Sequence, residues 1–241
     1  CLSLNTESVK NIIFALHSLA IGGWSATEPL ATLFFDARET AMMWLRIEHI
    51  FVFLLPPLVF HLVVTLLELK RTRWFIRIGY SLSGLFICGL FSPLLLWKLV
   101  PKAYAELWLV PGPLYHFFFA FFWLYVTASL WYLWRGCCLS VGTRHQQIKW
   151  FFIASLLGYV GGGSDYLLVY GYYIPWLSPW ALYLVPVYKL ITAYVIVQHH
   201  FLDIHVVVRK SLVYSILVSV LTMVYFTFIY CVEQFFQISF G

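Results

Sequence analysis

Several ionisable side chains lie inside otherwise apolar stretches of this sequence, and six of them are the residues best placed to do chemistry. A charge near the centre of a bilayer costs about 3 kcal/mol on insertion scales, so such a side chain usually faces the interior of a helix bundle and a partner. We expect a polar cavity, open to the outside, that binds a small ligand or an ion. The six residues are Glu28, Arg46, Glu48, His49, Asp165 and Lys189.

Helical spacing groups part of this set. At about 100° per residue, Arg46, His49 and His61 share one broad face of a helix, whereas Glu48 points elsewhere. The groups on that face are then placed to meet acidic residues from neighbouring helices. Internal salt bridges that fix helix packing, with Arg46 and Glu48 at the membrane interface, explain the same pattern equally well, so both interpretations stay open.

The composition indicates what kind of protein must position these residues. Of the 241 residues, 62% are hydrophobic and only 10% are charged, whereas charged residues make up about 25% of a soluble domain. Runs of roughly 20 apolar residues recur along the chain, which is the signal of transmembrane helices. We therefore predict one all-α domain, residues 1–241, folded as a polytopic transmembrane helix bundle in a lipid bilayer. The seven predicted spans are 11–35, 41–67, 75–100, 114–134, 148–170, 182–198 and 211–231.

Basic residues set the predicted orientation, because Lys and Arg in short loops are kept on the cytoplasmic side. If the chain starts in the cytoplasm, most of its 15 Lys and Arg residues lie on the inner side. Lys189 is then near the middle of its span. The other five candidates fall in the outer halves of their spans.

Two sequence features should shape the local backbone. The pair Pro56-Pro57 should kink the second span. The run Gly161-Gly162-Gly163, next to Asp165, permits close helix approach. The same run also suits a broken helix that exposes carbonyl groups beside Asp165, as in some transporters.

No catalytic or cofactor motif accompanies these residues. The sequence contains no GxGxxG, Walker lysine loop, HExxH or GxSxG, and its five cysteines lack zinc-site spacing. His199, His200 and His205 have no Cys or acidic companions that would complete a metal site. We therefore predict no metal and no cofactor. The net charge of +5 lies in particular loops, which argues against a nucleic-acid partner.

Four blocks of sequence, in order and spacing, resemble the N-terminal seven-transmembrane sensor region of bacterial histidine kinases. The last block is the most specific, since it joins an aliphatic–Tyr–aliphatic span, a polar step with an Asp-Ile pair, and a basic pair that opens another span. The blocks are NIIFALHSLAIGGW (11–24), AMMWLRIEHIFVFLLPPLVFHLVVTL (41–66), RHQQIKWFFIASLLGYVGGGSDYLLVYG (144–171) and ITAYVIVQHHFLDIHVVVRKSLVYSIL (191–217).

The resemblance implies a signal-input domain in a bacterial inner membrane, acting as a homodimer and sensing an extracytoplasmic or intramembrane stimulus. It also implies a span before Cys1, and kinase or cyclase modules after Gly241 in a parent protein that would carry the enzymatic activity. The ligands of such regions are mostly undefined. The six candidate residues therefore rest on charge placement alone.

Two other functions fit the sequence. The first is an accessory or scaffolding subunit of a larger membrane complex, which suits the aromatic fraction of 20%. In such a subunit, His61 or His116 would be the ligand to a haem or pigment. The second is a small-molecule carrier built around Asp165 and Lys189. A carrier should show internal repeats, and none is convincing here, so the sensor is the leading hypothesis.

Overall fold

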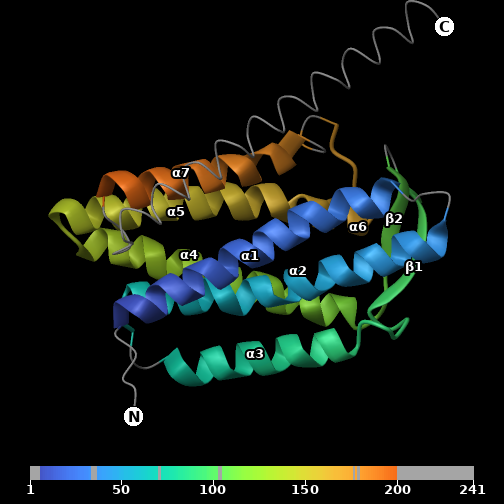
Figure 1. Cartoon of the computed structure of the whole chain (residues 1–241), viewed down its shortest axis with the longest axis horizontal. Helices are drawn as coiled ribbons and strands as arrows, with labels where there is room; N and C mark the ends of the chain where they lie inside the picture. The colour runs from blue at the N-terminus through green and yellow to red at the C-terminus, as the bar shows by residue number, and fades with distance from the viewer. Residues whose placement is uncertain are drawn as a thin grey trace, which may run out of the picture.

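The computed structural model describes residues 6–33, 37–69, 72–102, 105–175, 177 and 180–199. These residues form a bundle of helices with a β-hairpin at one end (Figure 1). We call the end that holds the hairpin the hairpin end, and the opposite end, where residues 140–141 connect two helices, the turn end. In chain order the elements are α1 (Thr6–Leu33), α2 (Arg38–Leu66), α3 (Arg73–Cys88), β1 (Leu96–Lys102), β2 (Ala105–Pro111), α4 (Tyr115–Leu139), α5 (Gly142–Gly163), α6 (Asp165–Val169), η2 (Trp180–Tyr183) and α7 (Leu184–His199).

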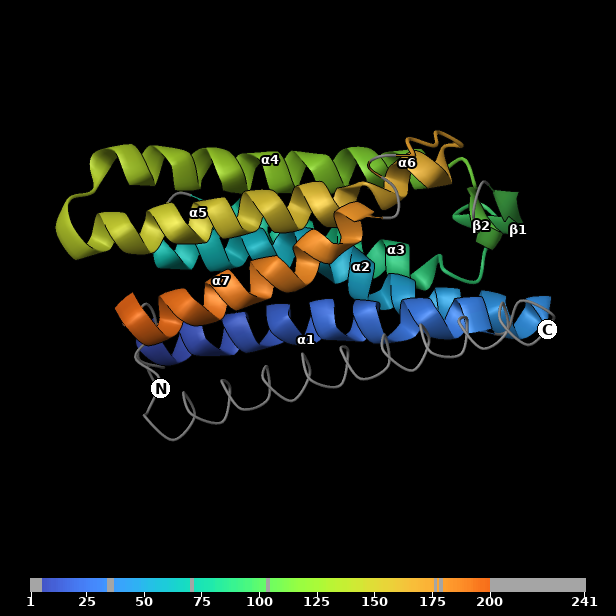
Figure 2. The ribbon, with the colours of Figure 1, turned by 90° about the horizontal axis from the view of Figure 1, so that it is seen from above.

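Helix α2 occupies the centre of the bundle. It packs against α1, α3 and α4, while α5 packs against α4 and α7. Figure 2 shows α1 and α4 on opposite sides of the molecule. A helix that is apolar all round is suited to burial, and Phe53, Val59 and Leu62 of α2 are completely buried.

Two prolines lie inside α2, which nevertheless continues unbroken from Arg38 to Leu66. A proline has no N–H, so Pro57 leaves the carbonyl of Phe53 without its helical donor. The hydroxyl of Ser83 in α3 donates to that carbonyl at 2.6 Å. A neighbouring helix thus satisfies the freed backbone group, as is required of a bundle in lipid.

The hairpin shows that the all-α prediction is wrong in one place. The third predicted span, 75–100, is helical only as far as Cys88, and residues 96–102 instead pair antiparallel with residues 105–111. Pro93 cannot continue a helix. The segments that follow, LWKLVPK and AELWLVP, are short and contain Val and Trp, which favour strands.

Three helical segments within the described residues are long and apolar enough to cross a membrane, as expected of a membrane protein. They are Arg38–Leu66, Tyr115–Leu139 and Gly142–Val169, and a shorter apolar helix covers Trp180–Ile196. The prediction of seven spans is not confirmed. The predicted span 211–231 lies outside the described residues.

The glycine run before Asp165 brings other elements close to α5. A Cβ on Gly161 would lie 2.6 Å from the carbonyl oxygen of Ala181, and one on Gly163 would lie 2.8 Å from the ring of Trp123. The helix is also interrupted here, because α5 ends at Gly163 and α6 begins at Asp165. The close packing expected from this run is therefore present. Ser164, between the two helices, keeps a right-handed helical backbone and donates to the Gly161 carbonyl, so that carbonyl is not left exposed as in a broken helix.

Candidate ligand-binding cavity

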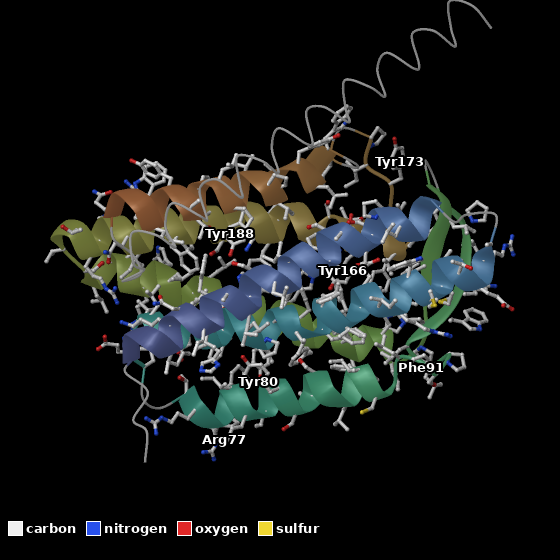
Figure 3. The ribbon with its side chains drawn as sticks, viewed as in Figure 1. Arg77, Tyr80, Phe91, Tyr166, Tyr173 and Tyr188 are labelled. Atoms are coloured by element: carbon white, nitrogen blue, oxygen red, sulfur yellow. The ribbon has the colours of Figure 1, made fainter. Side chains whose placement is uncertain are left out.

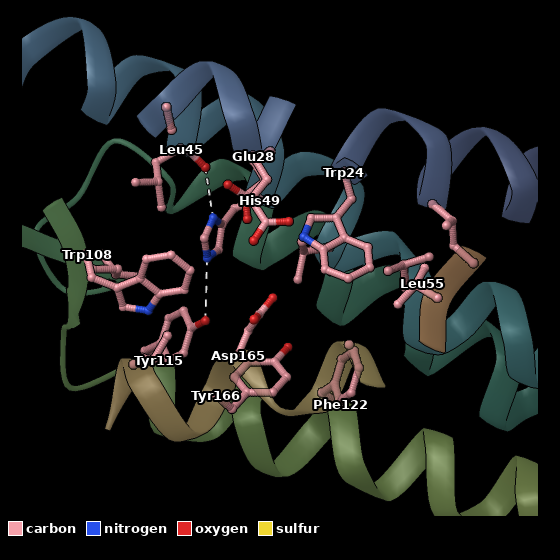
Figure 4. Close-up of a pocket in the computed structure, with 18 of the residues that line it drawn as sticks. Trp24, Glu28, Leu45, His49, Leu55, Trp108, Tyr115, Phe122, Asp165 and Tyr166 are labelled. Carbon is pink, nitrogen blue, oxygen red and sulfur yellow. Dashed lines mark hydrogen bonds between the residues drawn. The ribbon is translucent and has the colours of Figure 1, made fainter. Parts of the chain in front are cut away.

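A cavity of about 90 Å³ lies among the helices, toward the hairpin end (Figure 4). Its wall includes residues from α1, α2, α4, α5, α6, α7 and both strands. One water needs roughly 10–15 Å³ of such a cavity, so the space is large enough for several waters or a small organic group.

Three carboxylates from three separate elements line this cavity: Glu28 of α1, Glu48 of α2 and Asp165 of α6. Figure 4 shows the Glu28 and Asp165 side chains directed into the same space. Within the described residues, no Lys, Arg or His nitrogen lies within 4.0 Å of any of the three carboxylates. In the part of the chain that the structure describes, the three acidic groups therefore form no ion pair.

His49 connects α2 to α4 at the wall. Its Nδ1 lies 2.8 Å from the carbonyl oxygen of Leu45, which can only accept, so Nδ1 carries the hydrogen. In the neutral ring Nε2 is then an acceptor, and it lies 3.4 Å from the hydroxyl of Tyr115. The hydrogen bond to the main chain of α2 therefore fixes the tautomer of the neutral imidazole and leaves Nε2 as the acceptor at the cavity wall.

Three more polar atoms of the wall are buried without a hydrogen-bond partner among the described residues: Tyr166 Oη, Tyr188 Oη and Trp108 Nε1. The Tyr166 and Tyr188 side chains are only 7% and 1% exposed. Figure 4 shows the Tyr166 hydroxyl near Asp165, and Figure 3 places both tyrosines inside the bundle. A buried polar group without a partner costs about 1–3 kcal/mol, so water or a ligand in the cavity is expected to bond to them.

Four of the six predicted site residues line this one cavity: Glu28, Glu48, His49 and Asp165. That they bind a ligand stays a prediction. Helical spacing put Glu48 on a different face of the helix from His49, but both residues are buried and both line the wall. Helices α1 and α4 enclose α2 from two sides, so adjacent residues of α2 face the same interior space.

The other two candidates do not line the cavity. The Arg46 guanidinium lies 5.4 Å from the centre of the Phe91 ring. The Lys189 ammonium donates to the Ser18 hydroxyl at 3.3 Å and lies 5.1 Å from the centre of the Tyr188 ring. The salt bridges that would have explained the cluster as packing are therefore not formed by these two basic residues within the described chain.

The histidines considered as haem or metal ligands lie elsewhere. Through Nδ1, His61 contacts the Tyr80 hydroxyl at 3.2 Å and His116 contacts the Tyr170 hydroxyl at 2.8 Å. Neither lines the cavity. His200 and His205 lie outside the described residues. In the part of the chain that the structure describes, no group of three His, Cys, Asp or Glu residues is placed to hold a metal ion.

Sequence reasoning missed the aromatic part of the wall. Tyr166 and Tyr188 are sequence neighbours of two candidates, Asp165 and Lys189, and that adjacency was the available signal. Trp108 gave no such signal, since it reaches the cavity only because residues 105–111 form a strand that pairs with residues 96–102.

Comparison with known proteins gives no match to this chain among family models, curated proteins or solved structures. The resemblance to histidine-kinase sensor regions thus stays a prediction. The function has to be argued from the geometry of the cavity.

Proposed function

We propose that this chain is the membrane-embedded signal-input domain of a histidine-kinase-type receptor, located in a bacterial inner membrane and active as a homodimer. In this proposal the stimulus is a ligand that binds in the cavity. The observation that carries the proposal is the convergence of Glu28, Glu48 and Asp165 on one cavity without a basic partner among the described residues. An ionisable group inside a membrane bundle is expensive, and its presence favours a functional role.

Helix α7 offers a path from the cavity to the rest of the chain. Val185 and Tyr188 belong to the cavity wall, and the next residue, Lys189, bonds to Ser18 of α1. A ligand that moves the wall would change how α7 packs against α1. In this proposal the signal is a shift between two such packings, passed on to the residues beyond His199.

A second buried contact joins the same helices. His17 of α1 is fully buried, and its Nε2 lies 3.0 Å from the hydroxyl of Tyr159 in α5. Its ring also lies edge-on to Tyr188 of α7, with 6.3 Å between ring centres. Tyr159 and Tyr188 both line the cavity. A ligand bound there would therefore change the contacts between α1, α5 and α7 together.

The first experiment is to recover the native gene product from its own membrane and measure its intact mass. The proposal expects a polypeptide well above the 28.1 kDa of this chain, with a soluble kinase or cyclase part. A product of 28.1 kDa that co-purifies with other subunits would instead identify an accessory subunit of a membrane complex.

In that native protein, Asp165→Asn should reduce the range between the lowest and highest phosphorylation output by about tenfold or more, the equivalent of losing one interaction of about 1.4 kcal/mol. The reason is that the substitution removes an ionisable carboxyl group from the cavity wall and keeps the side-chain size. Arg46→Gln is the matched control, since Arg46 does not line the cavity, and it should leave the range unchanged. Membrane insertion of both variants is checked by fractionation. A normal range in a well-inserted Asp165→Asn protein would overturn the proposal.

A further inference from the structure

We infer that the ligand of this cavity is a small organic cation that carries an ammonium group. This inference rests on the proposed function in one respect, that the cavity is where the stimulus binds. It goes further by giving the chemical class of the ligand.

The charges of the wall favour a cation. Glu28, Glu48 and Asp165 lie close enough to interact electrostatically with one another. Burying like charges together is unfavourable, and their interaction is stronger in a protein interior than in water. Without a counter-ion these buried groups are therefore held in the neutral, protonated form, whereas a cation placed among them stabilises the ionised carboxylates and pairs with them. Among the described residues of the wall an anion would find no Lys or Arg, and a neutral molecule would offer no positive charge to pair with an ionised carboxylate.

The aromatic side chains favour an organic cation. Trp24, Trp108, Tyr115 and Tyr166 all line the cavity, and a cation over such a ring gains about 0.5–2 kcal/mol. Apolar side chains complete the wall and suit a hydrocarbon body, as is usual in small-molecule sites. They include Val52, Leu55, Phe122 and Val185.

The buried hydroxyl beside the acids fits the same ligand. Tyr166 Oη has no partner among the described residues, and its oxygen can accept a hydrogen bond from an ammonium N–H. Trp108 Nε1 only donates, so it would bond to water or to an oxygen of the ligand. A bare Ca²⁺ or Mg²⁺ ion fits less well, because no three possible ligand residues of the described chain are suitably grouped and these ions take six or more oxygen ligands.

Three molecules of similar size and different charge test the inference: n-butylammonium, 1-butanol and butyrate. Each is titrated against the purified chain in lipid nanodiscs, with tryptophan fluorescence and thermal unfolding as readouts. Butylammonium should give a saturable fluorescence change and raise the unfolding temperature, and the other two should not. Asp165→Asn should weaken butylammonium binding by about tenfold or more, as the loss of one partner of a buried charge pair does.

Glu68→Gln is the control for charge, since it removes one carboxylate that is outside the cavity and near Lys10. It should bind butylammonium as the unmodified chain does. Equal binding of butanol or butyrate, or of butylammonium to Asp165→Asn, would overturn the cation inference.

The inference and the proposed function fail in different ways. If no probe binds while signalling in the native protein still depends on Asp165, the cation inference falls and the signal-input function stands. If butylammonium binds as expected while signalling is insensitive to Asp165→Asn, the proposed function falls and the cation site stands.

Discussion

Hydroxyl side chains inside this bundle bond to backbone carbonyls in two ways. Thr65 and Ser129 each donate to the carbonyl four residues earlier in their own helix, at 2.8 and 2.6 Å. Those carbonyls also accept a helical N–H, so the hydroxyl is an additional donor. Ser83 differs, because it donates across to the Phe53 carbonyl, which Pro57 has deprived of its helical donor. One side chain in α3 thus supports the proline-containing centre of α2.

Ser83→Ala should therefore lower the free energy of unfolding by about 1 kcal/mol, the usual size of an interhelical hydrogen bond in a membrane bundle. Unfolding is measured in mixed micelles with increasing dodecyl sulfate. Ser129→Ala is the matched control, because it is the same change at a residue that is also almost fully buried, with 1% exposure. The Tyr125 carbonyl, which accepts from the Ser129 hydroxyl, keeps its backbone donor when that hydroxyl is removed.

A double-substitution cycle sharpens this test. Pro57→Ala restores the N–H that can bond to the Phe53 carbonyl, so the effect of Ser83→Ala should become smaller in that background. Equal effects in both backgrounds would show that Ser83 acts through packing and not through the freed carbonyl.

At the scale of elements, α5 can approach α7 and η2 this closely only because residue 161 is glycine and has no side chain. Gly161 meets both the carbonyl oxygen of Ala181 and the Cβ of Leu184, at 2.6 and 2.8 Å from where its own Cβ would be. Neither neighbour is the flexible end of a side chain, so neither can give way easily. Val185, one residue further along α7, lines the cavity, and its position therefore depends on this approach.

Gly161→Ala should push the start of α7 away from α5 and destabilise the fold by about 1–3 kcal/mol, the usual cost of overpacking. The control is Gly22→Ala in α1, where an added Cβ meets nothing within 4 Å. That change should be neutral or stabilise by up to about 1 kcal/mol through helix propensity. Both are followed by thermal unfolding in nanodiscs. Similar unfolding temperatures for the two variants would show that α5 and α7 do not need this close approach.

Helices and buried charged positions could be predicted from the sequence. The packing of neighbouring elements around them could not. Charges such as Glu28 and Asp165 stand out in apolar runs because burying them is costly, so sequence alone predicted that they share an interior site. Whether Glu48 faces the cavity depends on how many helices surround α2. The periodicity of one helix carries no information about its neighbours, so this position could not be predicted from the sequence. The hairpin was missed because a short apolar run does not distinguish a strand from part of a transmembrane helix.

For the molecule as a whole, the two ends of the bundle are closed differently. At the turn end, the guanidinium of Arg144 donates to the carbonyl of Leu66, the last residue of α2. At the hairpin end, the ammonium of Lys102 in β1 donates to the carbonyls of Leu109 in β2 and Val169 in α6, at 2.7 and 2.5 Å. Lys102 thus fastens the hairpin to the element that carries Asp165.

This fastening keeps the hairpin over the cavity. Leu99 and Trp108, from the two strands, are part of the cavity wall. An isolated two-stranded hairpin is at best marginally stable in water, so its hold on α6 matters. Burial lowers the pKa of the Lys102 ammonium, and the two carbonyl acceptors offset part of that cost by bonding to the charged form.

Lys102→Met should therefore loosen the hairpin while the helices stay folded. The substitution keeps a long apolar side chain and removes both hydrogen bonds to carbonyls. Hydrogen–deuterium exchange of the amides in residues 96–111 should become about tenfold faster, which corresponds to the loss of about 1.4 kcal/mol of local stability. Lys98→Met is the matched control on the same strand, because the Lys98 ammonium lies over the Trp97 ring, 4.4 Å from its centre, and makes no bond to α6. If exchange in the hairpin is the same in both variants, packing of its apolar side chains on the helices must hold the hairpin in place without Lys102.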